Sequence, residues 1–374
     1  MTQAAPTTLS DTYDVAVVGG GLVGMAVALG LVSRGLRVLV LDGGDTGFRA
    51  ARANFGLIWI QTKGHQFRPY ARLSRRSAEL WPEFCYSLQD LTGLDIGYEH
   101  QGAYHLCLSE EAWHKRAMIM QRQFDSDLPV AGAYEMVERG RLDKDLPGLG
   151  NTVVGGCFCK LDGAVNPLTF YRALHAGFRA RSGCYLADHP VQQIEADGGG
   201  LRVTSGNNVY RADKIVLAAG LGNIDLAPQV GIETGLRPVR GQILVTQKLP
   251  LTLKYPTLTI RQMGDGGFIL GDSREDVGFD DGTTSKAVAN IASKAIASFP
   301  SLAHVQMLRV WGGLRTFTED GIPLYLRSPT HPNVHALNVH SGVTLAPIHM
   351  YDLAVAIETD SVEQEFPEFS RRRL

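Results

Sequence analysis

The stretch that decides the fold is residues 13–42, YDVAVVGGGLVGMAVALGLVSRGLRVLVLD. An apolar run at 15–18 leads into the glycine cluster GGGLVG at 19–24. An alanine-rich apolar segment follows, and a second, largely apolar run at 37–41 ends at Asp42. The order is that of a strand, a glycine turn, a helix, a second strand and an acid. It predicts the first unit of a Rossmann-like α/β fold.

The spacing within this unit predicts dinucleotide binding. Gly19 permits a tight turn, Gly21 lets a pyrophosphate approach the backbone, and Gly24 lets the helix pack against the strand. The start of the helix attracts phosphates, and Asp42 can accept hydrogen bonds from a ribose diol. The alternative is a glycine cluster that serves only as a turn, and the matching helix, strand and acid favour binding. The residues expected at this site are Gly19, Gly21, Leu22, Val23, Gly24, Asp42 and Gly43.

Composition is that of an ordinary globular protein, with 374 residues of which 44% are hydrophobic and 20% charged. This length allows two domains, and the net charge of −2 gives no electrostatic reason to expect binding to nucleic acid or to an anionic membrane. No apolar run reaches the roughly twenty residues that span a bilayer. Residues 1–12 lack the features of a secretion signal, and we expect a short disordered leader there.

The cysteine pattern favours a reducing, cytoplasmic environment. The five cysteines are odd in number and irregularly spaced, so no disulfide framework is predicted. Cys157 and Cys159 form the only close pair. They could bind a metal, but no second pair accompanies them. Two buried thiols on one face of a strand are the favoured interpretation, and no metal site is predicted.

Hydrophobic patterns along the chain alternate between two kinds of segment. The expected strands are 57–60, 102–108, 191–195, 201–205, 208–211, 214–217 and 334–339, and the expected helices are 68–92, 110–124, 285–299 and 343–357. The strand ending in Ala218-Ala219-Gly220 and the C-terminal strand and helix resemble returns to the dinucleotide unit. We therefore expect a nucleotide domain of 1–60, 156–229 and 311–374, and a second α+β domain of 61–155 and 230–310.

Six further segments, taken in order, resemble the FAD-dependent D-amino-acid oxidase superfamily, which includes glycine oxidase, sarcosine oxidase and amine dehydrogenase β-subunits. They are RAARANFG (49–56), GAVNPLTFYRAL (163–174), IVLAAGLGN (215–223), RPVRGQIL (237–244), WGGLRTFTEDGIPL (311–324) and HSGVTLAP (340–347). The resemblance covers nearly the whole chain. It implies FAD as cofactor and an FAD-binding Rossmann-like domain interleaved with an α+β substrate domain built on an antiparallel sheet.

Three departures from the family pattern leave the fold intact but open the question of the substrate. The flavin loop has Ala51 followed by Arg52, Thr316 stands where a proline usually follows Arg315, and the usual Gly-His-x-Gly is VHSG at 339–342. The stretch ANFGLIWIQTKGHQF, 53–67, is similar to the β-subunits of bacterial opine oxidases and D-hydroxyproline dehydrogenases. This similarity implies partner subunits with further redox centres, either FMN or iron–sulfur.

The resemblance also assigns cofactor-binding residues outside the first motif. They are Ala51, Arg52, Asn54, Phe55, Gly56, Val191, Ala219, Gly220, Gly241, Arg315, Gly342, Val343 and Thr344. The N–H groups of 342–344 would point at the flavin C2=O, where a helix dipole stabilises the charge of the reduced ring. The alternative is an ordinary helix start capped by Ser341. Arg52 could pair with a flavin phosphate or with substrate.

Three residues are candidates for chemistry on the substrate. The family resemblance implies that Arg315 binds a substrate carboxylate, which its planar fork suits, and the alternative is a surface salt bridge. His340 lies beside the substrate or is a satisfied structural residue. Lys63, with His65, could bind a second carboxylate as an opine requires, or the two form a polar turn. Tyr104 and Tyr255 line the pocket or belong to the core.

These expectations lead to one function and its alternatives. The favoured function is FAD-dependent oxidation of an amino acid or secondary amine, whether imino acid, N-alkyl amino acid or opine, by hydride transfer from the Cα–H to flavin N5. The chain would be the catalytic β-subunit of a multi-subunit dehydrogenase. The alternatives are an NAD-linked Rossmann dehydrogenase, a stand-alone amino-acid oxidase that forms H2O2, and a flavin subunit that mainly relays electrons to partners.

Overall fold

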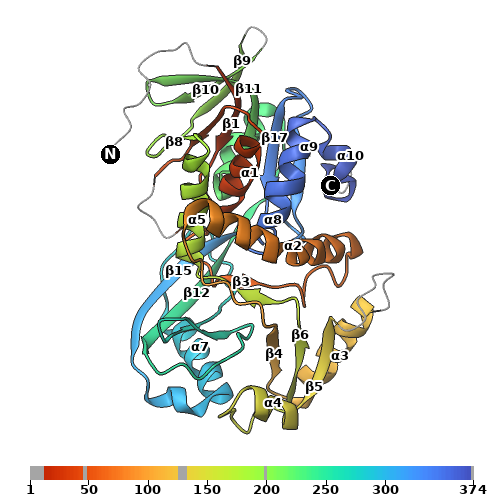
Figure 1. Cartoon of the computed structure of the whole chain (residues 1–374), viewed down its shortest axis with the longest axis vertical. Helices are drawn as coiled ribbons and strands as arrows, with labels where there is room; N and C mark the ends of the chain where they lie inside the picture. The colour runs from red at the N-terminus through yellow and green to blue at the C-terminus, as the bar shows by residue number, and fades with distance from the viewer. Residues whose placement is uncertain (1–11, 45–48, 125–132, 198–199, 372–374) are drawn as a thin grey trace.

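The computed structural model describes residues 12–44, 49–124, 133–197 and 200–371. Residues 1–11, most of the expected leader, lie outside this range. The chain folds around one large sheet, in the upper half of Figure 1, and smaller sheets in the lower half. Within the described ranges, no helix is long and apolar enough to cross a membrane.

The large sheet joins the first, middle and last parts of the chain. Its order is β16 (Leu324–Arg327), β17 (Val334–Asn338), β11 (Asn208–Leu217), β1 (Thr12–Val18), β2 (Val38–Leu41) and β8 (Cys184–Leu186), with β9 (Gln193–Asp197) and β10 (Gly200–Ser205) attached to β11. β1 pairs in parallel with both β2 and β11, and β17 pairs in parallel with β11. The predicted βαβ unit is therefore confirmed and lies at the centre of the sheet.

The sequence interpretation divides β11 wrongly. The two strands expected at 208–211 and 214–217 are one continuous strand of ten residues. Its first half pairs antiparallel with β10, and its second half inserts between β1 and β17. The exposed polar residues Arg211 and Asp213 suggest a break, but they lie where the strand leaves the small hairpin and enters the buried sheet.

Antiparallel sheets form the rest of the molecule, as expected for the substrate-binding part. One has the order β13 (Ile260–Gln262), β14 (Gly267–Leu270), β12 (Arg237–Lys248) and β15 (Met307–Phe317). A second has the order β4 (Ala103–Cys107), β6 (Gly155–Cys159) and β5 (Tyr134–Glu138), and β3 (Leu57–Ile58) pairs with β7 (Gly163–Ala164). The expected domain boundaries at 156 and 311 fall inside β6 and β15, and the division into domains stays a prediction.

Helices cover the large sheet and connect it to the smaller ones. They are α1 (Leu22–Ser33), α2 (Arg68–Thr92), α3 (Glu110–Phe124), α4 (Arg139–Asp145), α5 (Pro167–Ala180), α6 (Asn223–Leu226), α7 (Ser285–Ser298), α8 (Ala346–Ile348), η4 (His349–Leu353), α9 (Ala354–Glu358) and α10 (Val362–Glu365), with shorter turns at η1 (Gly220–Gly222), η2 (Ala227–Val230), η3 (Pro300–His304) and η5 (Pro367–Phe369). The expected helices at 68–92 and 110–124 are confirmed as α2 and α3, and the helix expected at 285–299 is confirmed as α7.

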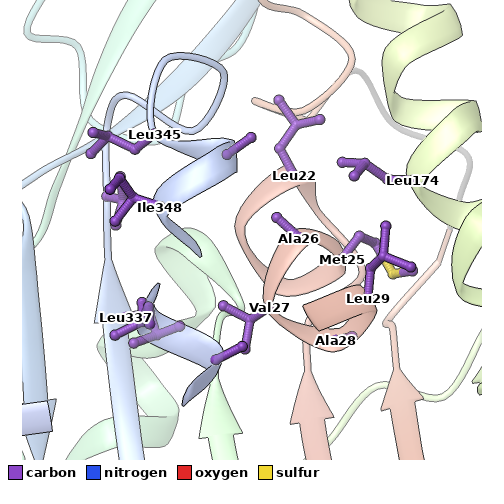
Figure 2. Close-up of a cluster of buried hydrophobic side chains, with 14 of the residues drawn as sticks. Leu22, Met25, Ala26, Val27, Ala28, Leu29, Leu174, Leu337, Leu345 and Ile348 are labelled. Carbon is purple, nitrogen blue, oxygen red and sulfur yellow. The ribbon is translucent and has the colours of Figure 1, made fainter. Parts of the chain in front are cut away.

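Helix α1 is buried on almost every side. Met25, Ala26 and Leu29 have no exposed surface, because α5 packs on one side of α1 and the C-terminal helices pack on the other. Figure 2 shows this cluster, with Leu174 of α5 and Ile348 of α8 on opposite sides of α1. An all-apolar helix of this kind gains its stability from burial of its whole circumference.

The C-terminal helix differs from the expected continuous helix at 343–357. Residues 342–345 form turns, and the helix that follows is divided into α8, the π-helical η4 and α9. The wide π turn lies where the backbone of Met350 meets Gly30 of α1, since a Cβ added at Gly30 would lie 2.1 Å from the Met350 carbonyl oxygen. The apolar period of the sequence does not reveal this local widening.

We predict that replacement of Gly24 by alanine destabilises the fold. The new Cβ would lie 2.0 Å from the carbonyl oxygen of Gly19, so α1 must move away from β1. Such overpacking costs roughly 1–3 kcal/mol, which urea denaturation of the apoprotein measures. Gly140→Ala is the matched control, because nothing lies within 4 Å of the added Cβ. Equal stability of the Gly24 and Gly140 variants would contradict the close packing.

Candidate active site

The glycine loop and the start of α1 form an open cradle. Gly21 is the N-cap residue of α1 and has no side chain that could cap the helix. The N-cap residue therefore leaves the first N–H groups of the helix without a side-chain acceptor. A Cβ added at Gly21 meets only the side chain of Ala51, at 3.9 Å. Gly19 and Gly24, in contrast, are packed against backbone. The loop therefore leaves open space beside Gly21 at the start of α1, which is the arrangement that binds a phosphate.

Asp42 closes the second side of this cradle, at the end of β2. The residue is 7% exposed, and its Oδ2 accepts a hydrogen bond of 2.7 Å from the N–H of Gly20. Its Oδ1 accepts from the N–H of Gly44 at 3.0 Å and lies 3.5 Å from the Arg49 guanidinium. Gly43 follows directly. The carboxylate is thus fixed at the edge of the glycine loop, where a ribose hydroxyl would meet it.

The expected flavin loop is held largely by its own hydrogen bonds. Asn54 donates its amide to the carbonyl of Ala51 at 2.7 Å and accepts from the N–H of Gly56 at 2.8 Å, so it braces the loop from within. The Arg52 guanidinium lies over the ring of Tyr171, 5.4 Å from its centroid. Phe55 extends to the end of β14, where a Cβ added at Gly271 would lie 2.9 Å from its ring.

The C-terminal turn meets the start of α1. A Cβ added at Gly342 would lie 3.4 Å from Val23 and 3.5 Å from Leu22, so the two glycine-rich turns are neighbours. Val343 is buried in the main core. Thr344 accepts a hydrogen bond from the N–H of Trp59 through its hydroxyl, at 3.1 Å.

Ser341 does not cap a helix, so the capping alternative is wrong. Its hydroxyl lies 2.6 Å from the Lys63 Nζ and 2.7 Å from the hydroxyl of Tyr70. The three-residue helix α8 begins later and has no side-chain cap. The Ser341 hydroxyl therefore contacts Lys63 and Tyr70 and not the N–H groups of a helix.

Two further predicted contacts flank the cradle. Ala219 and Gly220 follow β11, and the carbonyl of Ala218 packs directly against Gly19. Val191 is half-buried between β8 and β9. Its segment is tied to Asp42, because the N–H of His189 donates to the Asp42 carbonyl at 2.8 Å. The adenine-facing role of Val191 stays a prediction.

Arg315 extends from β15 across the neighbouring strand. Val239 is its partner in β12, and the guanidinium lies over Gly241, where an added Cβ would come within 2.1 Å of it. Gly241 therefore makes room for the arginine. The guanidinium donates to the Ser273 carbonyl at 2.9 Å and pairs with Asp272. The Arg315 side chain is 22% exposed and that of Asp272 is 48% exposed, so the salt bridge stands at the mouth of the site.

Lys63 faces the same region from the turn after β3. Its ammonium donates to Ser341 and lies over the Tyr70 ring. Burial and, to a smaller extent, the charge of Arg315 lower the pKa of Lys63 to about 8, while the charge of Asp162 opposes the shift. His65 does not join it, because its Nδ1 lies 3.4 Å from the carbonyl of Thr62 in its own turn. Of the two residues predicted to bind a second carboxylate, Lys63 points toward the turn at 340–342 and His65 contacts its own turn, and the binding role stays a prediction.

His340 lies between these cations as a neutral base. Burial holds its pKa well below the usual range, and the charges of Lys63, Arg315 and Arg274 add to that effect. Its ring lies 4.2 Å from the Phe317 ring, and the Arg274 guanidinium covers the same phenylalanine at 4.8 Å from the centroid. Arg274 was not found from the sequence, since an arginine in a polar loop carries no distinguishing pattern.

Other contributors also escaped the sequence interpretation. His175 of α5 approaches the carbonyl of Gly20 with its Nε2 at 3.0 Å and packs between Tyr171 and Tyr185. Ser77 and Trp81 of α2 both donate to the Thr344 carbonyl, at 2.7 and 3.1 Å. In the sequence these residues look like ordinary helix positions. Their partners are far away along the chain, so only the folded structure reveals them.

Several candidates belong to the core and not to the site. Tyr104 is fully buried, bonds Asp145 through its hydroxyl and packs edge-on against Tyr255. Cys157 and Cys159 are both buried in β6, as expected for two thiols on one strand face. A cavity of about 540 Å³ between α2 and the C-terminal segment is lined by none of the predicted site residues.

The chain matches the family model described as FAD dependent oxidoreductase over residues 14–351. One of the subunits of the opine oxidase of Rhizobium meliloti is 39% identical to it, over 96% of this chain and 97% of that protein. Glycine oxidase of Bacillus licheniformis is 26% identical, over 95% and 96%. The crystal structure of glycine oxidase from Geobacillus kaustophilus has a TM-score of 0.84 at 24% identity, covers 95% of both chains, and so shares the fold.

The residues present fit the cofactor that this family carries. The start of α1 would hold the phosphates of a dinucleotide beside the open side of Gly21, and the carboxylate of Asp42 would meet its ribose. The turn at Gly342 lies next to this site. The family match also removes the NAD-linked alternative. The chain belongs to the FAD-dependent oxidoreductase family, and its cofactor is FAD.

Proposed function

We propose that this chain oxidises a secondary amine with two carboxylates, of the opine type, drawn from the wider class of amino acids and N-alkyl amino acids. The observation that carries the proposal is the pair of cations beside the turn at 340–342, which are Arg315 from β15 and Lys63 from the turn after β3. Each cation can hold one carboxylate. The bound FAD would supply the acceptor, at N5, for the hydride that leaves the substrate Cα.

Arg315 holds the carboxylate next to the reacting carbon. Its guanidinium is oriented by the Ser273 carbonyl and lies over Gly241, so it keeps its position without the substrate. Asp272, which is about half exposed, turns to solvent when the substrate carboxylate takes its place. This exchange replaces one carboxylate by another, so it leaves the charge of the site unchanged.

Lys63 holds the second carboxylate and His340 stays neutral. A neutral imidazole adds no third positive charge, and it can accept or donate a hydrogen bond to the substrate amine. No base is required for hydride transfer, because the neutral amine delivers hydride directly. The site thus attracts the two negative ends of an opine while leaving its central nitrogen beside an uncharged group.

We further propose that the chain works with partner subunits that carry FMN or an iron–sulfur cluster. Support comes from its similarity, over almost the full length of both chains, to proteins that are subunits of opine oxidases. The alternative, a stand-alone oxidase that forms H2O2, draws on the weaker similarity to glycine oxidases. Oxygen consumption by the purified holoenzyme, with and without co-expressed partners, separates these two.

The test of the proposed function is anaerobic mixing of the holoenzyme with candidate amines. Opines, D-hydroxyproline, sarcosine and D-amino acids are compared by the loss of flavin absorbance at about 450 nm. We expect rapid bleaching with a dicarboxylate opine and slower bleaching with the monocarboxylates. Fast bleaching by sarcosine or glycine alone, or no bleaching by any amine, contradicts the proposal.

Replacement of Arg315 by alanine is expected to weaken substrate binding while FAD stays bound. Loss of a charge-assisted, two-point contact costs about 1.5–3 kcal/mol, so the KM of the bleaching reaction rises about ten- to a hundredfold. Arg309→Ala, at an exposed position of the same strand, is the control. An unchanged KM would remove Arg315 from the site, and loss of FAD would make it a cofactor ligand instead.

Binding of a dicarboxylate is expected to depend on pH through Lys63. The ammonium is charged below its pKa of about 8 and neutral above it, so the second contact is present at neutral pH and disappears as pH rises. Thiodiacetate and (methylthio)acetate are unreactive thioethers with two and one carboxylates, and their Kd values follow from flavin absorbance shifts. From about pH 7 to about pH 9.5 we expect the preference for thiodiacetate to fall roughly tenfold.

Lys63→Met provides the control for this pH effect. Its preference for thiodiacetate should be low and flat over the same pH range, while the affinity for (methylthio)acetate is unchanged. A pH-dependent preference that persists in Lys63→Met would show that a group other than Lys63 titrates over this range, and it would contradict the assignment of the second carboxylate to Lys63.

A further inference from the structure

We propose that Asp162 and Arg116, two buried charged residues outside the cation pair, hold the turn at 60–63 and set the position and charge of the Lys63 ammonium. The inference deepens the proposed function, on which it rests for the statement that Lys63 meets the substrate. Both residues are positioning residues, since they act on the substrate only through Lys63. Neither was singled out by the sequence, and neither belongs to a recognised motif of the chain.

The first contact is between Asp162 and the beginning of the turn. Asp162 is fully buried, and its Oδ1 accepts a hydrogen bond of 2.6 Å from the N–H of Ile60. The carbonyl of Ile60 accepts in turn from the N–H of Lys63 at 2.9 Å, which closes a four-residue turn. Asp162 therefore fixes the first residue of the turn whose last residue is Lys63. The pairing of β3 with β7 brings the two segments together.

The second contact is between Arg116 and the next residue of the turn. Arg116 of α3 is 3% exposed and donates from Nη2 to both oxygens of Gln61, at 2.7 Å to the side chain and 3.2 Å to the backbone. The Gln61 amide donates to the Ala103 carbonyl of β4 at 3.2 Å. The turn is thus held at two successive residues by buried polar groups. Removal of either group leaves buried partners unsatisfied and frees the turn.

Asp162 also supplies the negative charge that opposes the lowering of the Lys63 pKa. Burial lowers the pKa of Lys63, the charge of Arg315 lowers it further, and the charge of Asp162 raises it. Burial raises the pKa of Asp162 to about 7, against the bonds from Ile60 and Gln61 and the charge of Arg116. Arg116 therefore favours the ionised carboxyl, and that ionised carboxyl favours the protonated ammonium.

The other groups that face this pair do not replace the negative charge. On the Lys63 side they are Arg315, the neutral His340, and the hydroxyls of Ser341 and Tyr70. On the Asp162 side they are Arg116 and the groups whose pKa values are raised by burial, namely Cys157, Cys159 and Tyr134. Around neutral pH the thiols and the phenol are uncharged. Among the described groups that act on Lys63, Asp162 is the one that keeps it charged.

The experiment measures the charge of Lys63 directly, in the holoenzyme and without substrate. The rate of lysine acetylation by trace acetic anhydride is followed by mass spectrometry from about pH 6 to about pH 10, with exposed Lys286 as the internal reference. We expect the reactivity of Lys63 to rise with a midpoint near pH 8 in the natural protein. In Asp162→Asn, which keeps the shape of the side chain, the midpoint falls by about one pH unit.

A second variant tests the positioning role apart from the charge. Arg116→Lys retains a positive charge, but the lysine side chain is shorter and does not place its ammonium where the Arg116 Nη2 bonds both oxygens of Gln61. We expect its Lys63 midpoint to stay near pH 8, while its Kd for thiodiacetate rises several-fold and its Kd for (methylthio)acetate does not change. Asp265→Asn, an exposed carboxylate between β13 and β14, is the control for both measurements.

The results that test the roles of Asp162 and Arg116 can be told apart from the results that test the proposed function. An unshifted midpoint in Asp162→Asn overturns the charge role, and an unchanged preference for thiodiacetate in Arg116→Lys overturns the positioning role. If Asp162→Asn does not fold, the Arg116 variant decides alone. A shifted midpoint in a protein that no amine bleaches supports the link between Asp162 and Lys63 while the proposed substrate fails.

Discussion

The contact between the C-terminal turn and the start of α1 is the constraint on which the site depends. Gly342 lies against Leu22 and Val23, although these residues are near opposite ends of the chain. Parallel pairing of β2, β1, β11 and β17 produces this contact, because the carboxyl ends of parallel strands open at one edge of a sheet. The glycine loop, Asp42, Ala219 and the turn at 342–344 each follow one of these strands.

Electrostatic repulsion between positive charges governs the part of the site around His340. Lys63, Arg274 and Arg315 all act on the partly buried His340, and the charge of each lowers its pKa. Positive charges brought together in a partly buried place repel one another, and burial together with the charge of Arg315 lowers the pKa of Lys63 to about 8. An anion relieves that repulsion when it binds. The accumulated cations therefore favour an acidic ligand over a simple amine, and perturbed groups of this kind gather at functional sites.

How far the sequence predicts this molecule depends on the distance over which each interaction acts. The unit at 13–42 was predicted correctly because its turn, helix and strands are specified by neighbouring residues. The cap of α5 is equally local, because the Asn166 side chain accepts from the N–H groups of Leu168 and Thr169. The family resemblance pointed to Arg315, Gly342 and Gly241 as candidate residues. It did not explain why position 241 is a glycine, and the structure shows that the Arg315 side chain needs the space.

The missed features all depend on contacts between distant segments. His175 supports the Gly20 carbonyl, and Ser341 serves Lys63 and Tyr70 instead of a helix. The continuous helix expected at 343–357 is interrupted where it crosses α1, which its own apolar period does not indicate. Lys63 and His65 look equivalent in the sequence, and only the fold directs one inward and leaves the other on its own turn.

Arg315 and Lys63 are held in position by different parts of the structure, and this difference bears on substrate specificity. Arg315 is part of a long strand that pairs with β12 over most of its length, so its position follows from the sheet itself. Lys63 stands on a short turn that regular structure does not fix, and its position depends on Asp162 and Arg116 instead. In the proposed function, the contact to the first carboxylate thus depends on the sheet itself. The contact to the second depends on a few buried side chains, and a change in these alone can alter which amine is accepted without disturbing the sheet.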